Sequence, residues 1–157
     1  FRFLLAATLV LVFITVRGAL LGASITQFTF CAAARTEIVV LGVFGLAALG
    51  ALHHLAARLT TGADDLPSEG LTDLAFWAAV LGVLGVGIGF SAAGFVQSGV
   101  HANAMKDFLK DGIVAVAGQL KLVTAGYAAL TVAALAFLAN FGLAIRRACA
   151  ACCGGAR

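Results

Sequence analysis

The sequence predicts an all-α integral membrane protein in which four transmembrane helices form one bundle. Apolar residues make up 62% of the 157 residues, and charged residues only 11%, against about 25% in an average soluble domain. So few charges cannot cover a water-soluble domain of this size, and lipid must therefore solvate much of the surface. The 19 glycines agree with this prediction, because small residues are frequent where membrane helices pack together.

Four apolar segments are long enough to cross a bilayer, which takes about 20 residues of α-helix. They cover residues 3–24, 38–55, 71–96 and 122–145, and we treat the whole chain, 1–157, as a single transmembrane domain. Transmembrane β-strands are excluded, because the apolar runs are continuous and do not alternate with polar residues. The first run is too long for a signal peptide and lacks the small-residue cleavage pattern.

The links between the predicted spans define two sides of the membrane. An even number of spans places both chain ends and the acidic link at residues 56–70 on one side, which we call side A, and the links at 26–36 and 97–121 on the other, side B. Basic residues are divided five against five between the sides, so the positive-inside rule does not fix the orientation. The Arg146-Arg147 pair, followed closely by cysteines, favours side A as the cytosolic, stromal or matrix side.

The longer side B link has a pattern of its own. Met105, Phe108 and Leu109 recur at helical spacing between charged residues, which is typical of a short amphipathic interfacial helix on the membrane surface between the third and fourth helices. An ordinary charged loop is the alternative. We expect Gly112 and Gly118 to separate this piece from the fourth span, because one helix through both would be far longer than the roughly 30 Å hydrocarbon core requires.

Glycines three or four residues apart recur on two of the predicted spans. Gly18 and Gly22 lie on the first span, and Gly82, Gly85 and Gly89 lie on the third. A glycine-lined face lets two helix backbones approach closely, so that dispersion contacts hold them together. Two interpretations stay open: these helix-packing residues serve the four-helix bundle itself, or they serve lateral association with another membrane protein.

Two sets of charges are candidates for pairing between the predicted helices. Arg17 lies roughly 21 Å past Phe3, inside the first span, and either snorkels toward side B or pairs within the bundle. Glu37, at the opening of the second span, is the nearest candidate partner. On side A, Asp73 opens the third span near Arg2, and an ion pair between them would fix the register of the helices.

Three histidines are the candidates for binding a cofactor. His53 and His54 close the second span, and His101 follows the third. Neighbouring residues on a helix point about 100° apart, and His101 lies on the opposite side of the membrane, so the three cannot share a metal ion. A single imidazole in lipid can be an axial ligand of chlorophyll or haem. The alternative is an interfacial histidine without a ligand.

Residues 146–157 form a short tail that contains Cys149, Cys152 and Cys153. Cysteines beside a membrane span and next to arginines are candidates for lipidation by palmitate, and unmodified cysteines are the alternative. A single CxxC does not supply the four ligands of a zinc site. The chain contains no hydrolase, metalloprotease or nucleotide-binding motif and no basic cluster with interleaved aromatic residues. We therefore expect neither an enzyme nor a nucleic-acid-binding protein.

The openings of two spans carry a family resemblance. The segment FRFLL at residues 1–5 places Arg2 at the start of the first span, and LTDL at 71–74 places Asp73 at the start of an Ala/Gly-rich third span. This layout resembles the four-span MARVEL family and its plant relatives, the Casparian strip membrane domain proteins. The resemblance implies that Arg2 and Asp73 form the family's charged pair at the cytosolic face and that the protein scaffolds membrane platforms. The side B loop lacks the cysteines of the plant family, which puts a barrier-forming role in doubt.

These observations favour a non-enzymatic tetraspan protein that packs laterally in the lipid bilayer, against other integral membrane proteins or its own copies, and organises or stabilises an assembly. That hypothesis requires no cofactor. One alternative is an accessory subunit of a photosynthetic or respiratory complex that holds chlorophyll or haem through histidine. A second is a small channel or transporter. The sequence does not distinguish the plasma membrane from a thylakoid or mitochondrial membrane.

Overall fold

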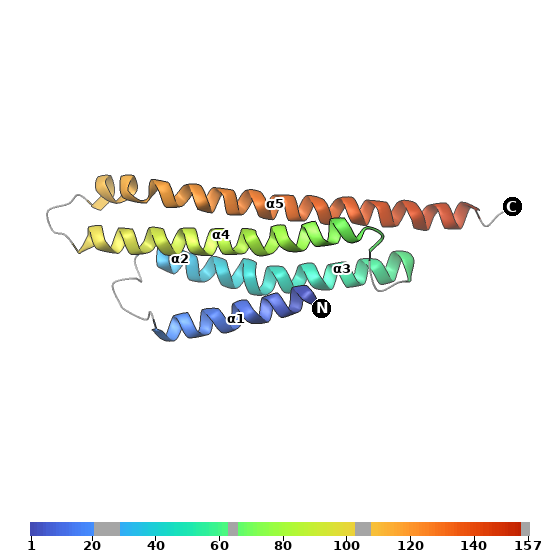
Figure 1. Cartoon of the computed structure of the whole chain (residues 1–157), viewed down its shortest axis with the longest axis horizontal. Helices are drawn as coiled ribbons and strands as arrows, with labels where there is room; N and C mark the ends of the chain where they lie inside the picture. Colours follow the sequence, from blue (N-terminus) through green and yellow to red (C-terminus); the bar gives the residue numbers. More distant parts are fainter. Residues whose placement is uncertain (21–28, 63–65, 103–107, 155–157) are drawn as a thin grey trace.

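The computed structural model describes residues 1–20, 29–62, 66–102 and 108–154, and within these ranges every regular element is helical. Four helical rods lie side by side (Figure 1), with the α4 rod between α5 and the rod that contains α2 and α3. The elements are α1 (Arg2–Leu20), α2 (Phe30–Glu37), η2 (Ile38–Gly45), α3 (Leu46–Thr61), α4 (Glu69–His101) and α5 (Phe108–Gly154). The predicted all-α fold is confirmed for this part of the chain.

Three of the rods are long and apolar enough to cross a membrane. They include Phe30–Thr60, Glu69–Val100 and Asp111–Ala150, which fits an integral membrane protein. The remaining helix, α1, has 19 residues and is about 28 Å long. Its described part is not among the three candidate spans, so a fourth span stays a prediction.

The second rod begins earlier than the sequence suggested. Its first helix, α2, starts at Phe30, so most of the predicted link at 26–36 is helical. The Thr29 side chain explains this start, because its hydroxyl accepts a hydrogen bond from the Cys31 backbone N–H, 3.3 Å away, and so caps the helix. The rod then passes through η2, a π-helix with wider turns than an α-helix, and continues without interruption into α3.

The prediction that two glycines interrupt the helix before the last span is wrong. Gly112 and Gly118 do not separate an interfacial piece from the last span, because both lie inside α5, which runs for 47 residues, or about 70 Å. Glycine weakens a helix by about 1 kcal/mol, which the buried contacts of neighbours such as Val116 can outweigh. A separate interfacial helix is not shown, since Phe108 and Leu109 belong to α5 and Met105 lies outside the described residues. Helix α5 also extends into the predicted tail, as far as Gly154.

Helices α4 and α5 approach each other closely, and glycines make this approach possible. A methyl group added to Gly82 would lie 2.7 Å from Leu130 Cγ, and one added to Gly89 would lie 2.7 Å from Val123 Cγ2. A methyl group on Gly85 would meet the Cα atom of Gly126 at 3.2 Å. Helix α5 therefore covers the glycine face of α4, and this face is not free for a lateral partner.

Other glycines bring the second rod against its neighbours. A methyl group on Gly42 would lie 2.7 Å from a side-chain carbon of Val10 on α1, and one on Gly87 would lie 2.7 Å from Ile38 on η2. Thus α4 uses two glycine faces, one toward α5 and one toward η2. Of the first predicted pair, Gly18 lies in α1 with its surroundings undescribed, and Gly22 lies outside the described residues.

Replacing Gly126 by alanine should lower the stability of the fold. The added methyl group would lie 2.7 Å from the Val86 backbone nitrogen and 2.9 Å from the Gly82 carbonyl oxygen, so the two helices would have to separate. Overpacking of this kind costs about 1–3 kcal/mol. Thermal unfolding in detergent measures the effect. Gly118→Ala on the same helix is the matched control, because its methyl group meets nothing within 4 Å, and it should be neutral or stabilising. Equal melting temperatures for the two variants would contradict the proposed close approach.

Candidate functional site

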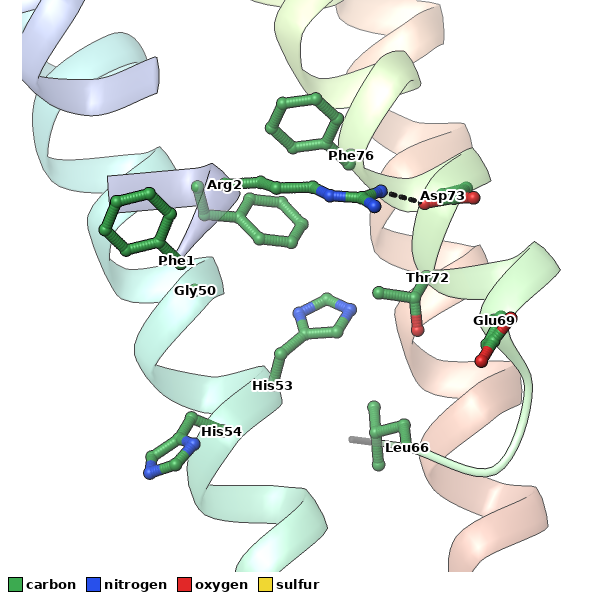
Figure 2. Close-up of a pocket in the computed structure, with 11 residues that line it drawn as sticks. Phe1, Arg2, Gly50, His53, His54, Leu66, Glu69, Thr72, Asp73 and Phe76 are labelled. Atoms are coloured by element: carbon green, nitrogen blue, oxygen red, sulfur yellow. Dashed lines mark hydrogen bonds and ion pairs between the residues drawn. The ribbon is translucent and has the colours of Figure 1, made fainter. Parts of the chain in front are cut away.

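A pocket opens where the start of α1, the middle of α3 and the first turns of α4 meet (Figure 2). Its volume is about 410 Å³, within the range of roughly 300–1,000 Å³ that is usual for small-molecule sites. The wall combines charged groups with aromatic rings: Arg2, Asp73 and Glu69 lie near Phe3 and Phe76. The charged residues that the sequence predicts at the openings of the first and third spans thus lie beside the two histidines of α3.

The expected charge pair is present at this pocket. The Arg2 Nη1 atom donates a hydrogen bond to Asp73 Oδ1 at 2.7 Å, and Figure 2 shows the guanidinium reaching from α1 to α4. The two side chains are 72% and 54% exposed, so in water this ion pair would stabilise the fold by no more than about 1 kcal/mol. Its structural effect is to hold the first turn of α1 against the first turns of α4.

The histidines are placed very differently from one another. His53 is only 8% exposed, and its ring stacks on Phe3 at 4.9 Å and leans on Phe137 at 4.6 Å. His54 is exposed on the neighbouring face of α3. His101 ends α4 at the other end of the bundle, and its side chain lies outside the described residues. The Nε2 atom of His53 is fully covered, so a macrocyclic pigment could reach it only if the surrounding side chains moved apart.

Asn140 is a site residue that the sequence analysis missed. It is fully buried, and its Oδ1 atom accepts from the Ser68 backbone N–H at 3.1 Å. Its Nδ2 atom donates to the Ser68 carbonyl at 2.9 Å and to Thr72 Oγ1 at 3.0 Å. One amide on α5 thereby fixes the chain just before α4, where Ser68 caps the helix by accepting from the Leu71 N–H. A single asparagine within an apolar span was the available signal, because polar groups inside a membrane are rarely left without a partner.

The other candidate charge pair, one of the two alternatives for Arg17, is not observed. Among the described side chains no ion pair joins Arg17 to Glu37. Glu37 instead lies beside the hydroxyl of Tyr127 on α5, which links the second rod to the last one. On the extended end of α5, Cys149 is an exposed free thiol, and the side chains of Cys152 and Cys153 lie outside the described residues.

Comparisons with family models, with curated proteins and with solved structures find no match to this chain. The resemblance to the MARVEL family therefore stays a prediction that rests on the residues around Arg2 and Asp73. In the described ranges, no three His, Cys, Asp or Glu side chains come close enough together to hold a metal ion. The pocket therefore brings charged and aromatic side chains together without a cluster that could hold a metal ion.

Replacing Asn140 by leucine should loosen the start of α4. The change removes three hydrogen bonds and leaves the partly buried Ser68 N–H without a partner, a loss of about 1–3 kcal/mol. Hydrogen exchange measured by mass spectrometry should show faster exchange of the amides at residues 68–72. Thr131→Val on the same helix is the control, because the Thr131 hydroxyl is exposed and bonds only to the Tyr127 carbonyl of its own helix. Unchanged exchange in the Asn140 variant would show that this contact does not hold the turn.

Exchanging the charges of Arg2 and Asp73 tests their pairing. Arg2→Asp and Asp73→Arg should each lower the melting temperature, because each places two like charges within contact distance. The double variant should recover most of the loss, with a coupling free energy of about 0.5–1 kcal/mol. Unfolding of the four proteins in lipid nanodiscs gives this coupling. Strictly additive losses would show that the two side chains act independently.

Proposed function

We propose that the protein is a non-enzymatic four-span membrane protein that packs laterally against other integral membrane proteins and stabilises an assembly. In this proposal α1 is the fourth span, since its length of about 28 Å is close to the thickness of a hydrocarbon core. The glycine face of α4 cannot mediate the association, because α5 covers it. The partner surface must therefore lie on the outer faces of the rods.

The open arrangement of the rods supports lateral packing. Helix α1 packs on η2 and α3, whereas α5 packs mainly on α4, so α1 and α5 stand at opposite edges of the molecule (Figure 1). The outward face of α5 carries large apolar side chains along its length, such as Leu135 and Leu138, which are 60% and 58% exposed. Within the hydrocarbon core lipid can cover such a face, so these residues do not by themselves require a partner.

The observation that carries the proposal is the position of Ile113 and Val114 near the start of α5. They are 66% and 74% exposed and lie about 40 Å along the helix from Asn140, which is level with the start of α4. If the charged groups around Asp73 mark one face of a hydrocarbon core of roughly 30 Å, these two side chains lie beyond the other face. Exposed apolar side chains outside the core favour a protein partner, because lipid tails do not reach them.

Replacing both Ile113 and Val114 by serine should dissociate the assembly without unfolding the chain. The matched control replaces Leu135 and Leu138 by serine, a pair of similar exposure on the same helix that faces lipid in this proposal. Blue-native electrophoresis of gently solubilised native membranes should show a smaller complex for the first variant, with loss of the proteins that comigrate with the unchanged chain. Complexes of identical size for both variants and the unchanged chain would overturn the proposal.

A further inference from the structure

We infer that the pocket beside His53 binds the hydroxyl group of a membrane lipid alcohol, such as a sterol or a diacylglycerol. The inference does not depend on lateral packing, because the pocket lies among α1, α3 and α4 and not on the outer face of α5. It rests on a buried hydrogen-bond acceptor without a partner, on the rigid setting of that acceptor, and on the charges around it.

The acceptor is the Nε2 atom of His53. The other ring nitrogen, Nδ1, lies 2.9 Å from the Leu49 carbonyl oxygen, which can only accept, so Nδ1 carries the proton. In a neutral imidazole Nε2 is then an acceptor, and no described side chain or backbone group bonds to it. Buried polar atoms almost always have partners. A donor from outside the described chain is therefore expected at Nε2.

The Thr72 hydroxyl, which belongs to the same pocket, cannot supply this donor. In Figure 2 the His53 ring points from α3 toward Thr72 on α4. The Thr72 hydroxyl, however, donates to the Ser68 carbonyl at 3.1 Å and accepts from Asn140 Nδ2 at 3.0 Å. Its single proton is therefore committed to Ser68, and the contact with Asn140 fixes its orientation.

The imidazole is also held in place, so it cannot turn to find another partner. Phe3 stacks on one side of the ring at 4.9 Å, and Phe137 lies against it at 4.6 Å. Phe3 comes this close because Gly50 has no side chain: a methyl group there would lie 2.7 Å from Phe3 Cβ. Two aromatic rings and one backbone hydrogen bond thus fix the direction of the free lone pair.

The charges around the pocket select a neutral headgroup. Asp73 is already neutralised by Arg2, and Glu69 is exposed and adds a negative charge at the rim. A phosphate headgroup would be repelled by Glu69. An ammonium group next to His53 would lose its water without gaining a free carboxylate, which is unfavourable. A hydroxyl donates one hydrogen bond and carries no charge, which is what the Nε2 atom can accept once the side chains that cover it move apart enough to admit one oxygen atom.

The position of the pocket favours a lipid as the source of the hydroxyl. It lies at the first turns of α4, where charged residues give way to an apolar span, and Phe3, Phe76 and Leu66 line it. A lipid alcohol has its hydroxyl at this depth and its apolar body in the membrane. The pocket volume of about 410 Å³ accommodates the headgroup and the adjoining part of such a molecule.

Photolabelling in vesicles tests the inference on the unchanged full-length chain. The purified protein is placed in phosphatidylcholine vesicles that contain either a diazirine sterol or a diazirine diacylglycerol, and labelling is quantified after irradiation. We expect labelling by at least one probe at residues of the pocket. Excess sterol or diacylglycerol with a free hydroxyl should compete, whereas the corresponding methyl ether, which cannot donate, should compete about three- to tenfold less well. Labelling by neither probe, or equal competition by the ether, would overturn the inference, and so would competition by soluble glycerol.

A variant pair tests the role of the nitrogen itself. His53→Phe keeps an aromatic ring between Phe3 and Phe137 but removes the acceptor, and labelling should fall about three- to tenfold. Tyr127→Phe is the control, because it also removes one polar atom from an aromatic ring but lies outside the pocket, and its labelling should be unchanged. Equal labelling of both variants would count against His53 as the acceptor. If His53→Phe does not fold, competition by the methyl ether on the unchanged chain still decides the question.

Discussion

The architecture depends on the close backbone approach of α4 and α5. Membrane helices gain no hydrophobic free energy by contacting one another instead of lipid, so dispersion between closely spaced backbones must hold them. Gly82, Gly85 and Gly126 allow that spacing, because a methyl group at any of them would crowd the facing helix. With α5 in this position, Asn140 reaches Ser68 and fixes the point at which α4 begins. The start of α4 in turn sets where Asp73 meets Arg2.

Polar groups near the start of α4 thus divide into two kinds. Those of Asn140 and Thr72 bond to one another or to Ser68. They therefore stabilise the turn and can form few additional hydrogen bonds. His53 differs, because one of its nitrogens is bonded within its own helix and the other is not bonded at all. The unpaired nitrogen lies beside a network whose other groups are already bonded. A donor from outside the protein can therefore bond to this one atom, from one direction. We regard this contrast as the strongest sign of ligand binding in the described part of the chain.

The sequence predicted the helical fold and the meeting of Arg2 with Asp73, because long apolar runs and charges at span openings are local signals. It did not predict where α5 ends, since the length needed to cross a bilayer is only the minimum length of a helix. The choice between internal and external packing at Gly85 depends on which helix lies opposite, and spacing within one span carries no such information. The free nitrogen of His53 depends on its rotamer and on Leu49, and neither is encoded in composition.

The π-helical segment η2 keeps the buried residues of the second rod on one side of it, which an ordinary α-helix would not do. The buried residues Ala34, Ile38, Gly42 and Leu46 recur every four residues along this rod. In an α-helix of 3.6 residues per turn, each such step would rotate the buried face by about 40°, and three steps would carry it about 120° away from α4. Wider turns absorb this rotation. The rod can therefore keep one buried face from α2, where it packs on α4, through η2 to the start of α3.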